Sequence, residues 1–264
     1  MIIFYDFNNH KEHMNKIDDL LIQSENVLQK NLNKEGVIHI LNILKCSFPL
    51  EILDEIQLYG DYLPKNKEIG FSREKRYLHF LWDVLDKSPM CLIANFAIPF
   101  RAILANKLFK SCGKNFICEE NVRFNVPDNM EIGDNVFINK GTLIDAKGGL
   151  IVGNSVGIGE GVTIFTHSHA EHDHSLRTYA PVIIKDYAKI YSNSTILPDT
   201  TIGEQSIVAA CSLVNKNVAP NSLVAGMPAK HIRDRKTFDN TRDRLGHVWL
   251  YNGEFQKEES SQKK

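Results

Sequence analysis

The stretch IKDYAKIYSNSTILPDTTIGEQSIVAACSLVNKNV, residues 184–218, has an aliphatic residue at every sixth position. These residues are Ile184, Ile190, Ile196, Ile202, Val208 and Val214, and four positions after each comes a small or β-branched residue: Ala188, Ser194, Thr200, Ser206, Ser212 and Val218. Six residues of an α-helix bring a side chain to the opposite face, and an ordinary strand alternates with period two. A period of six therefore predicts a parallel β-helix, in which each hexapeptide forms one flat side and its aliphatic residue points inward.

The same frame extends upstream of this stretch. It runs through Ile132, Ile138 and Ile144, slips by two residues at KGGL (147–150), and resumes at Val152, Ile158 and Ile164. It then breaks at FTHSHAEHDHSLRTYAPVI (165–183), which holds four histidines: His167, His169, His172 and His174. We expect this segment to be a loop extruded from one coil, and loops on a rigid scaffold are where reactive groups tend to sit.

The first hundred residues follow a helical pattern. Ser72 is a candidate N-cap, and after it Tyr77, Phe80, Leu81, Val84 and Leu85 lie at helical spacing. We therefore expect a helical N-terminal region at 1–112, a β-helix domain at 113–235, and a C-terminal tail at 236–264. The polar end of that tail, KEESSQKK, is expected to be disordered.

Composition narrows the class of protein and its location. The chain has 264 residues and a formal net charge of −1, so it lacks the basic field that nucleic-acid binding requires. Its five cysteines have no CxxC spacing, and residues 1–13 lack the pattern of a signal peptide, which together favour the cytoplasm. The apolar stretch 91–105 is broken by Pro99 and Arg101 and is too short to span a bilayer. A buried helix is expected there, and a peripheral helix at the inner face of the membrane is the alternative.

The chain resembles the hexapeptide-repeat acyltransferases over residues 113–235. The resemblance rests on the repeats and on three segments: IGDNVFINKGTLID (132–145), VTIFTHSHAEHD (162–173) and VAACSLVNKNVAPNSLVAGMPAKHIR (208–233). It is strongest for the branch that acetylates maltose, galactosides and polysaccharides. The resemblance implies a mainly β fold, a left-handed parallel β-helix with an α-helical N-terminal region added to it. It also implies acetyl-CoA as co-substrate, no metal, and a homotrimer with the site at the subunit interface.

The resemblance also assigns roles to individual residues. The base of the family falls on His169, with His167 as its near neighbour, and an imidazole suits the removal of a proton from a sugar hydroxyl. Contacts to CoA fall on Ser192, Ala210, Lys216 and Arg233, and contacts to the acceptor sugar fall on Asn139 and Asp145. A backbone N–H near Ser192 is implied as the donor to the oxyanion. The family's tryptophan and threonine are replaced here by Lys189 and Asn215.

We therefore predict an acetyl-CoA-dependent O-acetyltransferase that acts on a sugar or polysaccharide hydroxyl by direct transfer. Three alternatives stay open. One is N-acetylation of an amino sugar or nucleotide sugar. Another is a metal site like that of the γ-class carbonic anhydrases, although the sequence has no histidine between His79 and His167 to supply an upstream ligand. The third is a β-helix that serves as a non-catalytic scaffold.

Overall fold

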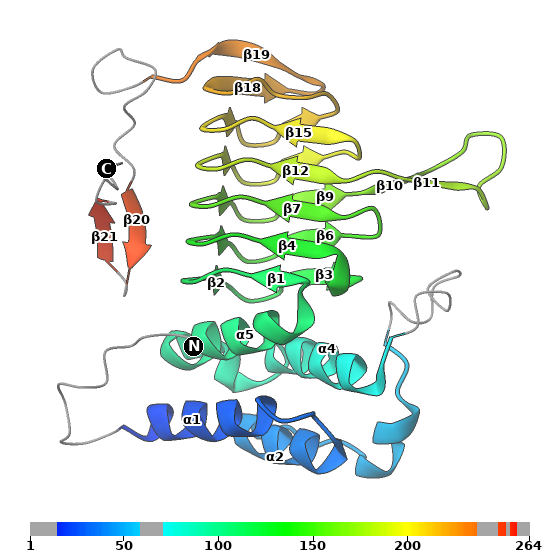
Figure 1. Ribbon diagram of the computed structural model, residues 1–264, viewed down its shortest axis with the longest axis vertical. Coiled ribbons are helices and arrows are strands. Elements are labelled where there is room, and N and C mark those ends of the chain that lie inside the picture. Colours follow the sequence, from blue (N-terminus) through cyan, green and yellow to red (C-terminus); the bar gives the residue numbers. More distant parts are fainter. Residues whose placement is uncertain (1–14, 59–70, 237–247, 252–253, 258–264) are drawn as a thin grey trace.

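The structure is a computed structural model, and it describes residues 15–58, 71–236, 248–251 and 254–257. A layer of helices lies at one end, and a column of short parallel strands is stacked on it (Figure 1). The predicted architecture, mainly β with an α-helical N-terminal region, is confirmed.

The helical region follows the amphipathic pattern of the sequence. Its elements are α1 (Lys16–Leu28), α2 (Lys34–Leu44), η2 (Leu50–Glu55), α4 (Arg73–Leu85), η4 (Pro89–Leu92) and α5 (Ala94–Leu108). The N-cap expected at Ser72 is present, because its hydroxyl accepts a hydrogen bond from the Lys75 N–H at 3.1 Å. The expected buried helix is α5, which continues through Pro99. No helix in the described part of the chain is long and apolar enough to cross a membrane.

The strands form three flat faces of a prism. Face A consists of β1 (Ser111–Cys112), β4 (Met130–Ile132), β7 (Leu150–Val152), β12 (Val182–Ile184) and β15 (Thr200–Ile202). Face B consists of β2 (Ile117–Cys118), β5 (Phe137–Ile138), β8 (Gly157–Ile158), β13 (Lys189–Ile190), β16 (Ile207–Val208), β18 (Ser222–Gly226) and β19 (Ala229–Asp234). Face C consists of β3 (Arg123–Asn125), β6 (Leu143–Asp145), β9 (Thr163–Phe165), β14 (Thr195–Ile196) and β17 (Leu213–Val214). Within each coil the chain passes from A to B to C, so corner BC follows each B strand and corner CA follows each C strand.

The period-six residues form the interior of the prism. All six aliphatic residues between Ile184 and Val214 are buried, and so are the six small or β-branched residues that follow them. Two of the buried hydroxyl groups donate to carbonyl oxygens of the corners: Ser194 donates to Tyr191 at 2.8 Å, and Ser206 donates to Gly203 at 2.7 Å. A serine therefore fits this apolar interior because its one donor is paired locally.

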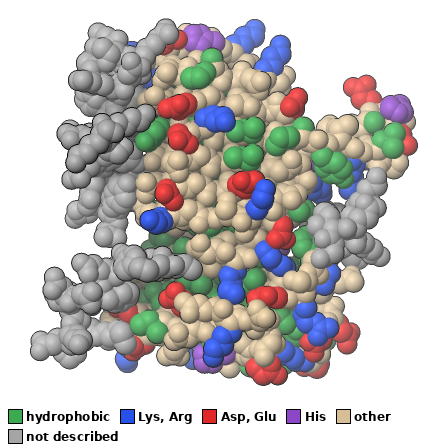
Figure 2. Space-filling view, in the orientation of Figure 1, with side chains coloured by type: hydrophobic (Ala, Val, Ile, Leu, Met, Phe, Trp, Pro, Cys, Tyr) green, Lys and Arg blue, Asp and Glu red, His purple; other side chains and the backbone are tan. Residues whose placement is uncertain are grey.

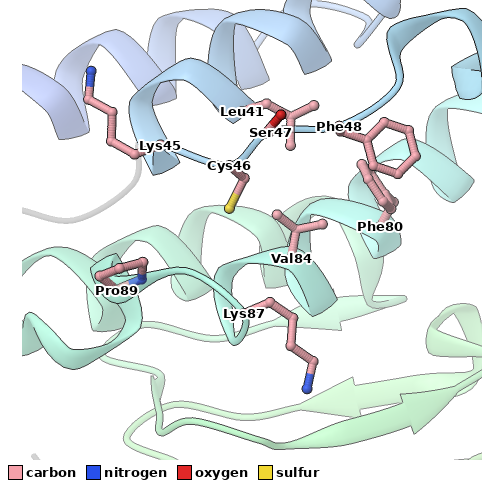
Figure 3. A pocket seen from close by; sticks show the side chains of 9 residues that line it. All are labelled: Leu41, Lys45, Cys46, Ser47, Phe48, Phe80, Val84, Lys87 and Pro89. Carbon is pink, nitrogen blue, oxygen red and sulfur yellow. The ribbon is translucent and has the colours of Figure 1, made fainter.

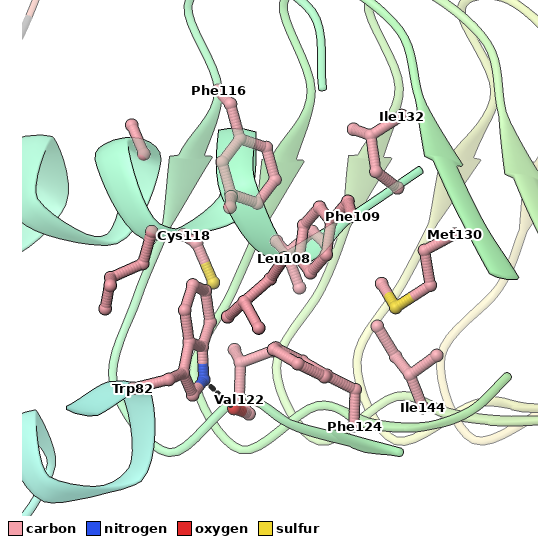
Figure 4. Packing of buried hydrophobic residues seen from close by; sticks show 14 of the residues in the cluster. Trp82, Leu108, Phe109, Phe116, Cys118, Val122, Phe124, Met130, Ile132 and Ile144 are labelled. Carbon is pink, nitrogen blue, oxygen red and sulfur yellow. Dashed lines mark hydrogen bonds between the residues drawn. The ribbon is translucent and has the colours of Figure 1, made fainter. Parts of the chain in front are cut away.

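The helices close the first coil of the prism with an aromatic cluster (Figure 4). Trp82 of α4 is fully buried, and its indole N–H donates to the Val122 carbonyl at 2.8 Å. Phe124 packs edge-on against Trp82, with ring centroids 4.9 Å apart. A buried ion pair joins Arg101 of α5 to Asp86, whose second oxygen accepts from the Asn121 N–H in the first coil. The helical region is therefore part of the same core as the β-helix.

The far end of the prism is closed by a strand that reverses direction. β19 runs antiparallel to β18 along the edge of face B. Farther on, β20 (Val248–Tyr251) and β21 (Glu254–Lys257) pair antiparallel with each other. Apart from Lys257, the segment expected to be disordered at the C-terminus lies outside the described residues.

Candidate active site

The break in the hexapeptide frame is a β-hairpin rather than an irregular loop. β10 (His167–His169) pairs antiparallel with β11 (Arg177–Tyr179), and the hairpin projects from corner CA (Figure 1). In the described residues, His167 and His169 lie two positions apart on one strand, so their side chains share a face of the hairpin. Their ring centroids are 5.3 Å apart.

The base of the hairpin is fixed by Thr166, which is fully buried. Its hydroxyl donates to the Asp145 carbonyl oxygen and accepts from the Gly148 N–H, both at 2.7 Å. Its own carbonyl accepts from the Ala180 N–H at 3.0 Å. These bonds tie the hairpin to the preceding coil. The backbone directly before His167 is therefore held in place.

His169 is held in one tautomer by the tip of the hairpin. Its Nδ1 lies 2.7 Å from the His174 carbonyl oxygen, and the two imidazole rings stack with centroids 4.0 Å apart. A carbonyl oxygen can only accept, so Nδ1 carries the proton and the lone pair is on Nε2. A neutral imidazole in this state can take a proton from a substrate hydroxyl.

His167 lies deeper, against the carboxylate of Asp145. Its Nδ1 is 3.1 Å from Asp145 Oδ2, in an electrostatic contact rather than an aligned hydrogen bond. Burial lowers the pKa of His167 below the value of a free imidazole, and the carboxylate of Asp145 opposes part of that effect. His167 is therefore neutral at neutral pH.

Asp145 is engaged on both of its oxygens. Oδ2 accepts from Lys147 Nζ at 2.6 Å and from Asn125 Nδ2 at 2.9 Å, and Oδ1 accepts from the Lys147 N–H at 3.2 Å. Burial alone would raise the pKa of Asp145, but the hydrogen bonds from Lys147 and Asn125 outweigh it and hold the pKa below its ordinary value. The sequence singled out Asp145 and missed these two partners.

A second group of candidate residues lies at corner BC. Asn139, Ser192 and Ala210 follow β5, β13 and β16 on the outside of the prism. Among the described residues the backbone N–H of Ser192 has no hydrogen-bond partner. A Cβ atom on Gly159 would lie 2.8 Å from this nitrogen, so the glycine keeps the space beside the N–H open.

The two remaining candidates lie toward the far end of the prism. Lys216 follows β17, so it lies at corner CA, two coils beyond the base of the hairpin. Its side chain is exposed, and its ammonium group has no partner among the described residues. Arg233 lies on β19, at the edge of face B, and donates to the Asp234 carbonyl at 2.9 Å.

The structure thus brings His167, His169 and Asp145 together and keeps Asn139 and Ser192 apart from them. The width of face C separates the two corners, which is about 15–20 Å for a side of about six residues. Within one chain the histidines therefore cannot meet the residues of corner BC.

The outer two histidines of the hairpin are exposed, and His172 has no interaction among the described residues. The described residues contain no group of three or more histidine, cysteine, aspartate or glutamate side chains placed to hold a metal ion. On the surface shown in Figure 2, basic and acidic side chains are interspersed over the prism and no single-sign patch stands out.

One hollow of about 430 Å³ lies in the helical region, away from the hairpin (Figure 3). Its wall includes Phe48 and Phe80, whose rings meet edge to face at 4.9 Å. The ammonium groups of Lys45 and Lys87 point away from it. None of the residues predicted for the active site lines this hollow.

Comparison with known proteins decides the family. A family model described as bacterial transferase hexapeptide (six repeats) matches residues 181–216. Over 139 residues the chain is 32% identical to galactoside O-acetyltransferase of Escherichia coli (strain K12). The alignment covers 51% of this chain and 68% of that one. The chain belongs to the hexapeptide-repeat acetyltransferases. It is therefore an acyltransferase.

Solved structures of hexapeptide-repeat acetyltransferases have the same fold. A galactoside acetyltransferase in complex with coenzyme A is 26% identical with a TM-score of 0.56, and the alignment covers 72% of this chain and 92% of that one. A hexapeptide-repeat acetyltransferase of Vibrio cholerae is 28% identical with a TM-score of 0.52, covering 62% of this chain and 94% of that one.

Proposed function

We propose that this hexapeptide-repeat acetyltransferase transfers an acetyl group from acetyl-CoA to a hydroxyl of a sugar or polysaccharide. The observation that carries the proposal is His169, whose Nδ1 proton is held by the His174 carbonyl so that Nε2 is free to act as a base. The relatives named for galactosides and maltose support a sugar acceptor. Acetyl-CoA is the acyl donor.

The reaction needs no covalent intermediate on the protein. The acceptor oxygen attacks the thioester carbonyl carbon while Nε2 of His169 takes the hydroxyl proton. The resulting oxyanion accepts a hydrogen bond from the Ser192 N–H, which is unpaired among the described residues. The C–S bond then breaks, and the imidazolium returns its proton to the CoA sulfur. Much of the reduction of the barrier would come from positioning the two substrates together.

His167 and Asp145 act on His169 indirectly, through charge and position. Two protonated imidazoles 5.3 Å apart would repel each other, so a neutral His167 favours the transient charge on His169. Asp145 orients His167, and an acceptor contact by Asp145 would have to compete with Lys147 and Asn125. We therefore assign Asp145 as a positioning residue for the histidine pair.

The separation of corners CA and BC supports a homotrimer in which neighbouring chains complete each site. Flat prism faces suit packing around a three-fold axis. In such an arrangement, corner CA of one chain supplies His169 and Lys216. Corner BC of its neighbour supplies Asn139, Ser192 and Ala210. CoA would lie between them, with the Lys216 ammonium group near its phosphates.

The test offers the protein acetyl-CoA and a panel of sugars, polysaccharides and amino sugars. Release of the CoA thiol measures the acetyl transfer. We expect release to depend on a sugar hydroxyl, to persist in the presence of a metal chelator, and to fall to background in His169→Ala. Transfer to amino groups alone would establish the N-acetyltransferase alternative. An absence of CoA binding would leave the protein as a scaffold and contradict the proposal.

A further inference from the structure

Three residues form an outward-facing column at corner BC. Asn139, Gly159 and Tyr191 each follow the inward residue of a face B strand, on β5, β8 and β13, which are neighbours in that order. Each therefore points away from the interior. The column carries an amide, then a position without a side chain, then an aromatic ring.

Tyr191 is unusual among the residues of this column. It is 49% exposed, and it lies within electrostatic reach of the Arg235 guanidinium. Its neighbours along the column are Gly159 on one side and Ala209 on the other, so neither of these two neighbours covers the ring with a large side chain. A lone exposed aromatic residue is ordinary on a protein surface, but this one directly precedes the unpaired N–H of Ser192.

Asn139 carries free donors at the other end of the column. Its Oδ1 accepts from the Lys140 N–H at 2.8 Å, which fixes the amide plane and leaves the Nδ2 hydrogens unpaired among the described residues. Two strand spacings separate Asn139 from Tyr191, or about 10 Å. Gly159 lies between them and adds no side chain, so the column leaves room for one sugar ring.

We propose that Tyr191 is a specificity-determining residue that stacks on the apolar face of the acceptor sugar, while Asn139 donates to its hydroxyls. The inference rests on the proposed function and adds to it the residue that recognises the ring. A pyranose has one face of C–H groups, which packs on an aromatic ring, and hydroxyls at its rim, which need donors and acceptors. Phenylalanine at position 191 would keep the stacking, whereas alanine would remove it.

The experiment measures steady-state kinetics with methyl galactoside and maltose as probes, in the full-length protein. Tyr191→Ala should raise the KM for the sugar about tenfold and leave the KM for acetyl-CoA unchanged. Tyr191→Phe should stay within about twofold of the wild type. Leu92→Ala, which removes an exposed apolar side chain from η4, is the control and should change neither constant. Saturation-transfer NMR measures binding of the same sugars in the presence of CoA. In Tyr191→Ala this binding should weaken in parallel with the rise in the KM for the sugar.

The outcomes separate this inference from the proposed function. An unchanged sugar KM in Tyr191→Ala would overturn the stacking role while the acetyltransferase activity stands. An equal rise in the KM for acetyl-CoA, or dissociation of the assembly in sedimentation, would overturn it as well, because Tyr191 would then serve CoA or subunit packing. If the wild-type chain transferred acetyl groups to neither sugars nor polysaccharides, the proposed function itself would fail.

Discussion

Corners CA and BC of the same prism are built in opposite ways. Corner CA carries a hairpin and a nearly buried charge network, in which Lys147 and His167 both contact Asp145. At corner BC the ion pair of Lys140 with Glu160 is exposed, and the corner carries an N–H without a partner in the described residues and the half-exposed ring of Tyr191. Proton transfer needs groups whose orientation is fixed, and ligand binding needs open space with free donors. Under the proposed function, the two corners would be two half-sites of each chain, and each half-site would be completed by a neighbouring chain of the proposed trimer.

The largest effect is expected from removing the base at corner CA. His169→Ala should lower kcat by about 10²- to 10⁴-fold, because general base catalysis contributes on that order. The KM for acetyl-CoA should change little, because the imidazole acts on the acceptor hydroxyl. Thiol release under saturating substrates measures both.

The matched control for this change is on the same hairpin. His172→Ala removes an exposed imidazole without contacts in the described structure and should keep nearly full activity. If His172→Ala lost as much activity as His169→Ala, the hairpin would act as a whole and the specific role of His169 would be wrong.

The charge network predicts the next effect, which is on stability. Asp145→Asn leaves the ammonium group of Lys147, whose side chain is 7% exposed, without its counter-charge. Removing one partner of such a pair costs about 3 kcal/mol in the free energy of unfolding. Urea unfolding at pH 7 measures it, and Asp199→Asn, at an exposed carboxylate of the same corner, is the control.

The same variant has a defined pH dependence. Because the pKa of Asp145 is below its ordinary value of 3.8, the stabilisation is fully present above about pH 4. It is lost as the pH falls through the depressed pKa of the folded state. The difference in stability between wild type and Asp145→Asn should therefore shrink only below pH 4, and a difference that vanished near pH 6 would contradict this assignment.

At corner BC, an added side-chain atom should affect stability and activity more than the removal of a charge. Gly159→Ala would place a Cβ 2.8 Å from the Ser192 nitrogen and 3.0 Å from the Ile190 carbonyl oxygen. Both atoms belong to the backbone, so the coil has to shift, at a cost of about 1–3 kcal/mol. We expect a lower Tm and a reduced kcat, because the shift moves the N–H assigned to the oxyanion. Unchanged values of both would remove Ser192 from the mechanism.

The fold could be predicted from the sequence because the repeat is local. Every aliphatic residue of the period points inward, so a pattern six residues long specifies the whole prism. The position of the candidate site could be predicted for the same reason, since the one long break in the frame carries His167 and His169.

The partners of these residues could not be predicted. Asn125 contacts Asp145 from the preceding coil, 20 residues away. Lys147 lies in the KGGL segment, where the hexapeptide frame shifts by two residues and no longer predicts which side chains are neighbours. The buried pair of Arg101 and Asp86 lies in the helical region, outside the hexapeptide repeat, and in the sequence Arg101 only interrupts an apolar stretch. Contacts of this kind depend on packing between elements and leave no spacing signal.

Subunit complementation tests most directly whether the two corners act in different chains. His169→Ala damages only corner CA, and Asn139→Ala damages only corner BC, so each alone should have low activity at limiting sugar. After co-refolding in equal amounts, about one quarter of the sites in a mixed trimer should have both corners intact. Recovery to about a quarter of wild-type activity is the predicted result, and activity that stays at the mean of the two parent variants would contradict a site shared between chains.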